Sequence, residues 1–174
     1  MRKAVAWFVL CGGLLLFPGL AFSETVMLYT QMQLRSEGPD RNLDRFAAIE
    51  DGVMSLFFDS GHIIFDTGMP QQPNLAGTNG QQSETWAIQE ARKGGADFLL
   101  EVSLSFPDAP YPAVVPLAIH YKLKQLANGL TLAEGDVTPA FQPSEVAEKK
   151  PYDLCFALGQ EVARHALAAW QQVS

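Results

Sequence analysis

The chain has 174 residues, of which 12 are Lys or Arg and 19 are Asp or Glu, and its formal net charge is -7. Such an acidic surface repels phosphate backbones and anionic head groups, which argues against nucleic acid and acidic membrane lipids as partners. The length suits one folded domain with a single apolar core.

The first 23 residues have the order of a secretory signal peptide. Arg2 and Lys3 precede an apolar run over residues 4–17, and the segment closes on Ala21-Phe22-Ser23. The apolar run is shorter than the roughly 20 residues that a membrane-spanning helix needs. We therefore expect cleavage after Ser23 and a periplasmic or secreted protein over residues 24–174, with no stable membrane span.

Loss of this segment changes the charge and the cysteine count. Two of the 12 basic residues are removed, so 10 remain against 19 acidic residues and the net charge becomes -9. Cys11 leaves as well, so the mature chain keeps Cys155 and has no intrachain disulfide. Because Cys155 lies in an apolar helical pattern, we expect its thiol to be buried.

The first half of the mature chain predicts two strands, each followed by a helix. Residues 25–32 are β-branched, aromatic and aliphatic, which is typical of a strand. Apolar residues from Leu43 to Phe57 recur at spacings of three and four and predict a helix that ends at Gly61. A short apolar strand is expected over 62–66.

A loop and a second helix come next. The segment 67–82 is rich in Gly, Pro, Gln and Asn, and it predicts an exposed loop. We expect Ser83 to cap the second helix and Gly94-Gly95 to close it.

The second half predicts three strands and a final helix. Apolar and polar residues alternate over 98–106 and again over 115–124, and Asn128-Gly129 then reverses the chain into 130–133. The last helix starts at Pro151. The element order β-α-β-α-β-β-β-α predicts an α/β (α+β) two-layer sandwich, with one mixed sheet of about five strands covered by about three helices.

Three short segments carry a family resemblance. They are 56–66, in which a helix, a glycine and a strand follow one another, then 91–100, and the hairpin 121–129. In these segments the chain resembles the CsgG, LpoB and TolB amino-terminal-like domains of the bacterial cell envelope. The resemblance implies a domain that docks onto other proteins without catalysis or a cofactor. The sequence shows no lipidation box, pore-forming strands or propeller, so only the shared domain is carried over.

One triplet suggests an enzyme instead. Asp66-Thr67-Gly68 follows an apolar strand and looks like the active-site segment of aspartic peptidases. That chemistry needs two aspartates that share one proton, so a chain with one triplet would have to act as a symmetric dimer. Met69-Pro70 stands where a small residue usually follows, and a helix precedes the strand where a peptidase has a hairpin. A strand end followed by a turn is the simpler interpretation.

Other residue types point to binding more than to chemistry. The histidines at 62, 120 and 165 have no metal-ligand spacing, and we expect neither a metal site nor a cofactor. Aromatic side chains at loop edges are common interface anchors, and Tyr111 is the first candidate, followed by Trp86 and Phe106, which also suit a core.

The sequence therefore favours a non-catalytic protein-interaction or assembly module of the bacterial envelope. Two alternatives stay open. One is a dimeric peptidase centred on Asp66, and the other is a small-ligand binder that uses a cleft beside residues 67–82.

Overall fold

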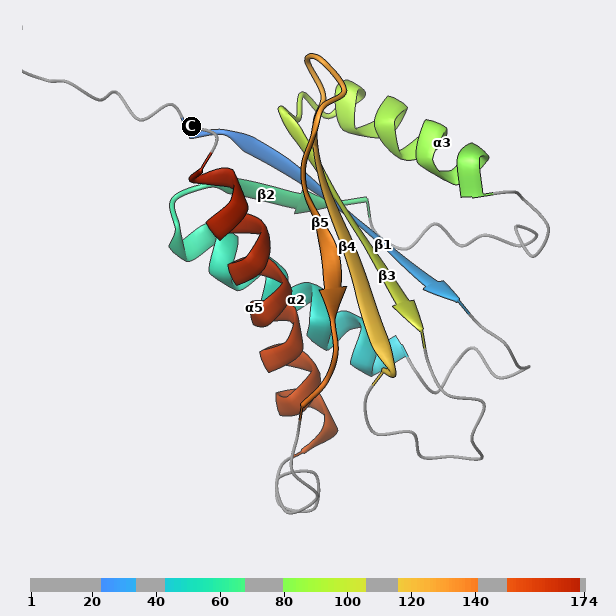
Figure 1. The fold of residues 1–174 in the computed structure, drawn as a ribbon, viewed down its shortest axis with the longest axis vertical. Coiled ribbons are helices and arrows are strands. Elements are labelled where there is room, and N and C mark those ends of the chain that lie inside the picture. The colour runs from blue at the N-terminus through green and yellow to red at the C-terminus, as the bar shows by residue number, and fades with distance from the viewer. Residues whose placement is uncertain (1–22, 34–42, 68–79, 106–115, 141–149, 173–174) are drawn as a thin grey trace, which may run out of the picture.

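The computed structural model describes residues 23–33, 43–67, 80–105, 116–140 and 150–172 (Figure 1). Its helices and strands follow the predicted order, and the predicted fold class is confirmed. The elements are β1 (Thr25–Gln33), α2 (Leu43–Asp59), β2 (Ile63–Asp66), α3 (Gly80–Lys93), β3 (Phe98–Ser105), β4 (Ala118–Gln125), β5 (Thr131–Val137) and α5 (Pro151–Trp170).

The five strands form one mixed sheet in the order β2-β1-β3-β4-β5. The pairs of β1 with β2 and with β3 are parallel, whereas β3, β4 and β5 pair antiparallel. The connections through α2 and α3 lead to strands on opposite sides of β1. Because such crossovers are right-handed, the two helices must lie on opposite faces of the sheet. Figure 1 shows this arrangement, with α3 apart from α2 and α5 and the sheet between them.

The core is divided by the sheet into two clusters, because successive side chains of a strand point to opposite faces. The larger cluster lies under α2 and α5, and it includes Val26, Leu28, Leu100, Val102, Ile119 and Leu123. The smaller cluster lies under α3, and its buried members are Met27, Tyr29, Ala87, Ala91, Leu99 and Leu126. One face is therefore covered by two long helices and the other by one shorter helix.

Helices α2 and α5 touch backbone to backbone at two glycines. A Cβ atom on Gly159 would lie 2.1 Å from the carbonyl oxygen of Ile49, and one on Gly52 would lie 2.1 Å from that of Phe156. Neither position has room for a side chain, so the two glycines fix how closely the helices approach.

Most predicted turns are confirmed, and one helix start is wrong. Gly61, Gly95 and Gly129 all have positive φ, with values of 86°, 73° and 73°. Helix α3 begins at Gly80, so Ser83 lies inside it and is not its cap. The two glutamines before Ser83 are good helix formers, which allows the helix to start earlier. Residues 68–79 of the predicted loop lie outside the described residues.

Candidate interaction surface

The described residues include three of the six side chains singled out in the sequence. Trp86 is half-buried on α3, where its ring centroid lies 5.6 Å from that of Tyr29. Asp66 is the last residue of β2, and Thr67 follows it; both are exposed. Gly68, Phe106 and Tyr111 lie outside the described residues. Trp86 and Asp66 belong to opposite faces of the sheet. Trp86 packs against the smaller cluster, whereas Asp66 pairs in register with Leu28 of the larger cluster.

A second carboxyl group, which we did not single out in the sequence, interacts with Asp66. Glu50 of α2 has its pKa raised to about 7, mainly by burial and in part by the charges of Asp66 and Asp51, while the Thr30 hydroxyl acts in the opposite direction. The Thr30 hydroxyl is buried and makes no hydrogen bond of normal geometry. Its lowering effect on the pKa of Glu50 is therefore smaller than the raising effect of the burial of Glu50. Glu50 lies four residues after Phe46 and so falls within the apolar stripe of the helix, which is the sequence signal for a half-buried acid.

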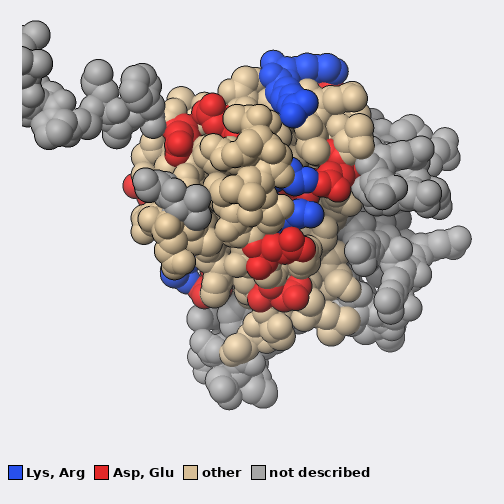
Figure 2. Space-filling model, turned by 45° about the horizontal axis from the view of Figure 1, so that its top comes forward, with Lys and Arg blue, Asp and Glu red and all other residues tan. Residues whose placement is uncertain are grey.

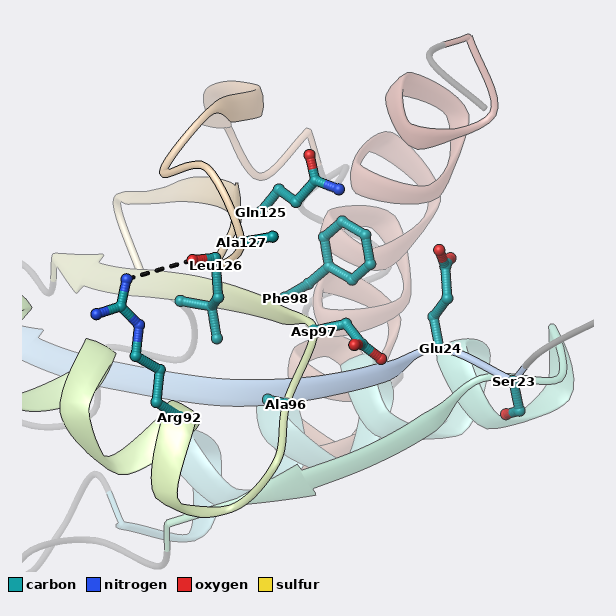
Figure 3. A pocket seen from close by; sticks show the side chains of 9 residues that line it. All are labelled: Ser23, Glu24, Arg92, Ala96, Asp97, Phe98, Gln125, Leu126 and Ala127. Atoms are coloured by element: carbon teal, nitrogen blue, oxygen red, sulfur yellow. Dashed lines mark hydrogen bonds between the residues drawn. The ribbon is translucent and has the colours of Figure 1, made fainter.

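The described part of the chain has a pocket of about 590 Å³ where β1 and β3 begin, at the other end of the parallel strands from Asp66 (Figure 3). Arg92 donates to the carbonyl oxygen of Leu126 at 3.3 Å, and the Asp97 carboxylate accepts from the backbone N–H of Thr25 at 2.9 Å. Both charged groups thus have partners within the fold. The lining residues are Ser23, Glu24, Arg92, Ala96, Asp97, Phe98, Gln125, Leu126 and Ala127.

The sheet face beside α3 carries charges of both signs. Glu101 of β3 stands opposite Lys122 of β4, and Lys122 stands opposite Glu134 of β5. His120 lies 3.0 Å from Asp136 through Nδ1, and its Nε2 lies 3.5 Å from Glu134. Figure 2 shows acidic side chains gathered beside basic ones on one side of the molecule. Cross-strand pairs of this kind make a polar surface with a defined charge pattern.

Neither an exposed cysteine nor a metal-binding cluster is found in the part of the chain that the structure describes. Cys155 is buried, and burial raises the pKa of its thiol to about 11, so the reactive thiolate is scarce at neutral pH. Within the described ranges, no three His, Cys, Asp or Glu side chains gather in a way that could hold a metal ion. Among the described helices, none combines the length and apolar character needed to cross a bilayer.

Comparison with known proteins finds similar folds among solved structures but no match in sequence. No family model matches the chain, and no curated protein matches it. Several solved bacterial structures have a similar fold.

One is PelC from Paraburkholderia phytofirmans, crystallised as a dodecamer, at 12% identity and a TM-score of 0.47 over 80% of this chain and 84% of that one. The lipoprotein GNA1162 from Neisseria meningitidis has 16% identity and a TM-score of 0.42 over 69% and 82% of the two chains. The C-terminal domain of LpoB from Salmonella enterica has 16% identity and a TM-score of 0.39 over 74% and 91%. LpoB and TolB, two of the names in the sequence resemblance, both occur among these solved structures.

Proposed function

We propose that this chain is an exported, non-catalytic docking or assembly module of the bacterial cell envelope. The observation that supports docking most directly is the mixed-charge face of β3, β4 and β5, which α3 leaves partly uncovered. Charges arranged across strands select partners by complementarity, because a wrong partner would place like charges together. The order of residues 1–23 supports export.

A partner that docks on this face should crosslink from it in living cells. We would place a photoactivatable amino acid at His120 in the full chain and, as a matched control, at Arg164 on the exposed side of α5. A single dominant envelope protein joined to position 120 and absent at position 164 is the expected result. Equal, diffuse crosslinking from both sites would contradict docking by this face.

The peptidase alternative has one observation in its favour, which is the raised pKa of Glu50 beside Asp66. A carboxyl group that keeps its proton near neutral pH can act as a general acid. Asp66→Asn separates the two functions, because it should abolish peptide hydrolysis and leave crosslinking from position 120 unchanged. Loss of crosslinking with this variant would tie Asp66 to docking instead.

A further inference from the structure

Helix α3 is held by less apolar packing than the other two helices. Of its described side chains, Ala87 and Ala91 are fully buried, and the Trp86 ring packs on Tyr29. Helices α2 and α5 bury many larger side chains against the other face of the sheet and against each other. Elements with few buried contacts open first in native proteins, so of the described helices α3 is the one best placed to open locally.

One buried ammonium group ties α3 to the sheet. Lys124 of β4 is only 9% exposed, and its Nζ donates to the Glu84 carboxylate of α3 across 40 positions of sequence. This hydrogen bond holds the pKa of Glu84 below its ordinary value. The pair therefore stabilises the closed position of α3, because opening would separate two charged groups that are in contact.

A second carboxylate lies on the same sheet face as Lys124 and diagonal to it, since Glu101 stands opposite Lys122 and Leu99 opposite Lys124. Glu101 of β3 has an oxygen, Oε1, that is buried and has no hydrogen-bond partner. Its pKa is raised, first by burial and then by the charge of Glu84, while Lys124 and Lys122 act in the opposite direction and Glu134 of β5 adds to the increase. On the remaining side, Tyr29 of β1 stands opposite Glu101. An unpaired buried carboxylate oxygen is costly, and the closed position of α3 carries that cost.

We propose that Lys124 is a latch shared by two carboxylates, pairing with Glu84 when α3 is closed and with Glu101 when α3 opens. Glu84 thus favours the closed position, and Glu101 favours the open one. Opening uncovers the apolar face formed by Met27, Tyr29 and Leu99. The latch does not depend on the envelope role proposed above, since it concerns an equilibrium within this chain.

The latch makes the closure of α3 depend on pH in two steps. As the pH falls from neutral, Glu101 takes up a proton first, because its pKa is raised and that of Glu84 is lowered. The competitor for Lys124 is then neutral, and closure becomes more favourable. At still lower pH, Glu84 becomes protonated too and the latch is released. Protection of α3 should therefore pass through a maximum in mildly acidic solution.

Residue-resolved hydrogen exchange of α3, with α5 of the same molecule as an internal reference, tests the proposal. Glu84→Gln should speed exchange over Trp86–Ala91, and Glu101→Gln should slow it, each by about three- to tenfold. Glu90→Gln is the matched control, since Glu90 lies on the same helix and pairs with Lys93. Unchanged exchange with Glu84→Gln, or faster exchange with Glu101→Gln, would overturn the latch.

A double-mutant cycle separates the latch from a general loss of stability. In Lys124→Met the shared ammonium is gone, so α3 should open more often, and Glu101→Gln should slow exchange less in that background, because only the burial cost of Glu101 remains to be relieved. If Glu101→Gln slows α3 exchange equally with and without Lys124, the two carboxylates do not compete for it and the proposal fails.

Discussion

Individual glycines set the packing of the two long helices. Gly52 and Gly159 each face a backbone carbonyl oxygen of the other helix, and a Cβ atom at either would be 2.1 Å from it. A backbone atom cannot turn aside as a flexible side chain can, so an added methyl group must push the helices apart. The glycines are therefore required despite their cost inside a helix.

Gly159→Ala should accordingly destabilise the fold by about 1–3 kcal/mol, although alanine is the better helix former. The free energy of unfolding from urea denaturation measures this. Ala157→Ser on the exposed side of α5 is the control and should change stability little. A Gly159→Ala protein as stable as the wild type would show that α2 and α5 do not approach this closely.

Glu50 gives the molecule an unusual pH dependence. Its pKa rises from an ordinary 4.5 to about 7 in the folded state, so the folded state binds its proton more tightly than the unfolded chain does. Its effect on stability is therefore most favourable below pH 4.5 and is lost as the pH rises to about 7.

Glu50→Gln should remove this loss and raise stability above pH 7 by about 1–2 kcal/mol, a figure already reduced for the solvent that reaches the half-buried group. Urea unfolding at a series of pH values checks it. Asp59→Asn, on the exposed end of the same helix, serves as the comparison. Identical pH profiles for the wild type and Glu50→Gln would show that Glu50 titrates normally.

At the scale of elements, the turn between α2 and β2 depends on one backbone conformation. Gly61 has a φ of 86°, and a Cβ atom there would meet no atom within 4 Å. The space is open, so a substitution at this position is costly only through the left-handed backbone. The turn also brings β2 into register with β1, where Ile63 donates its N–H to the carbonyl of Glu24 at 3.2 Å.

Gly61→Val should therefore cost about 1–2 kcal/mol, and Gly61→Asn clearly less, because asparagine tolerates this conformation. Thermal and urea unfolding of the two variants gives the comparison. Equal losses for Val and Asn would mean that a contact, and not the backbone conformation, determines the cost.

At the scale of the whole molecule, the expected cleavage site falls just before the sheet begins. Strand β1 starts at Thr25, and the Ser23 hydroxyl just before it donates to the carbonyl of Gly61 at 2.9 Å. Removal of residues 1–23 would therefore leave the ladder between β1 and β2 in place.

We predict that the exported protein begins at Glu24, and mass spectrometry of the intact protein from the envelope fraction measures this. Ala21→Leu and Ser23→Leu should block processing, because the peptidase requires small residues at these positions. An exported chain that still begins at Met1, or a lipid on Cys11, would contradict the prediction.

The sequence by itself determined the order and type of the elements, because apolar periodicity and positive-φ glycines are local signals. Gly61 and Gly95 follow the ends of helices, and Gly129 lies in the turn between β4 and β5, as expected. Only the tertiary structure decided which charges meet, since Glu84, Glu101 and Lys124 come from three elements and are brought together by crossovers and strand register. The tertiary structure likewise decided the close contact at Gly52 and Gly159 and the shifted pKa of Glu50. Such contacts depend on distances between segments far apart in the chain, which a one-dimensional pattern does not contain.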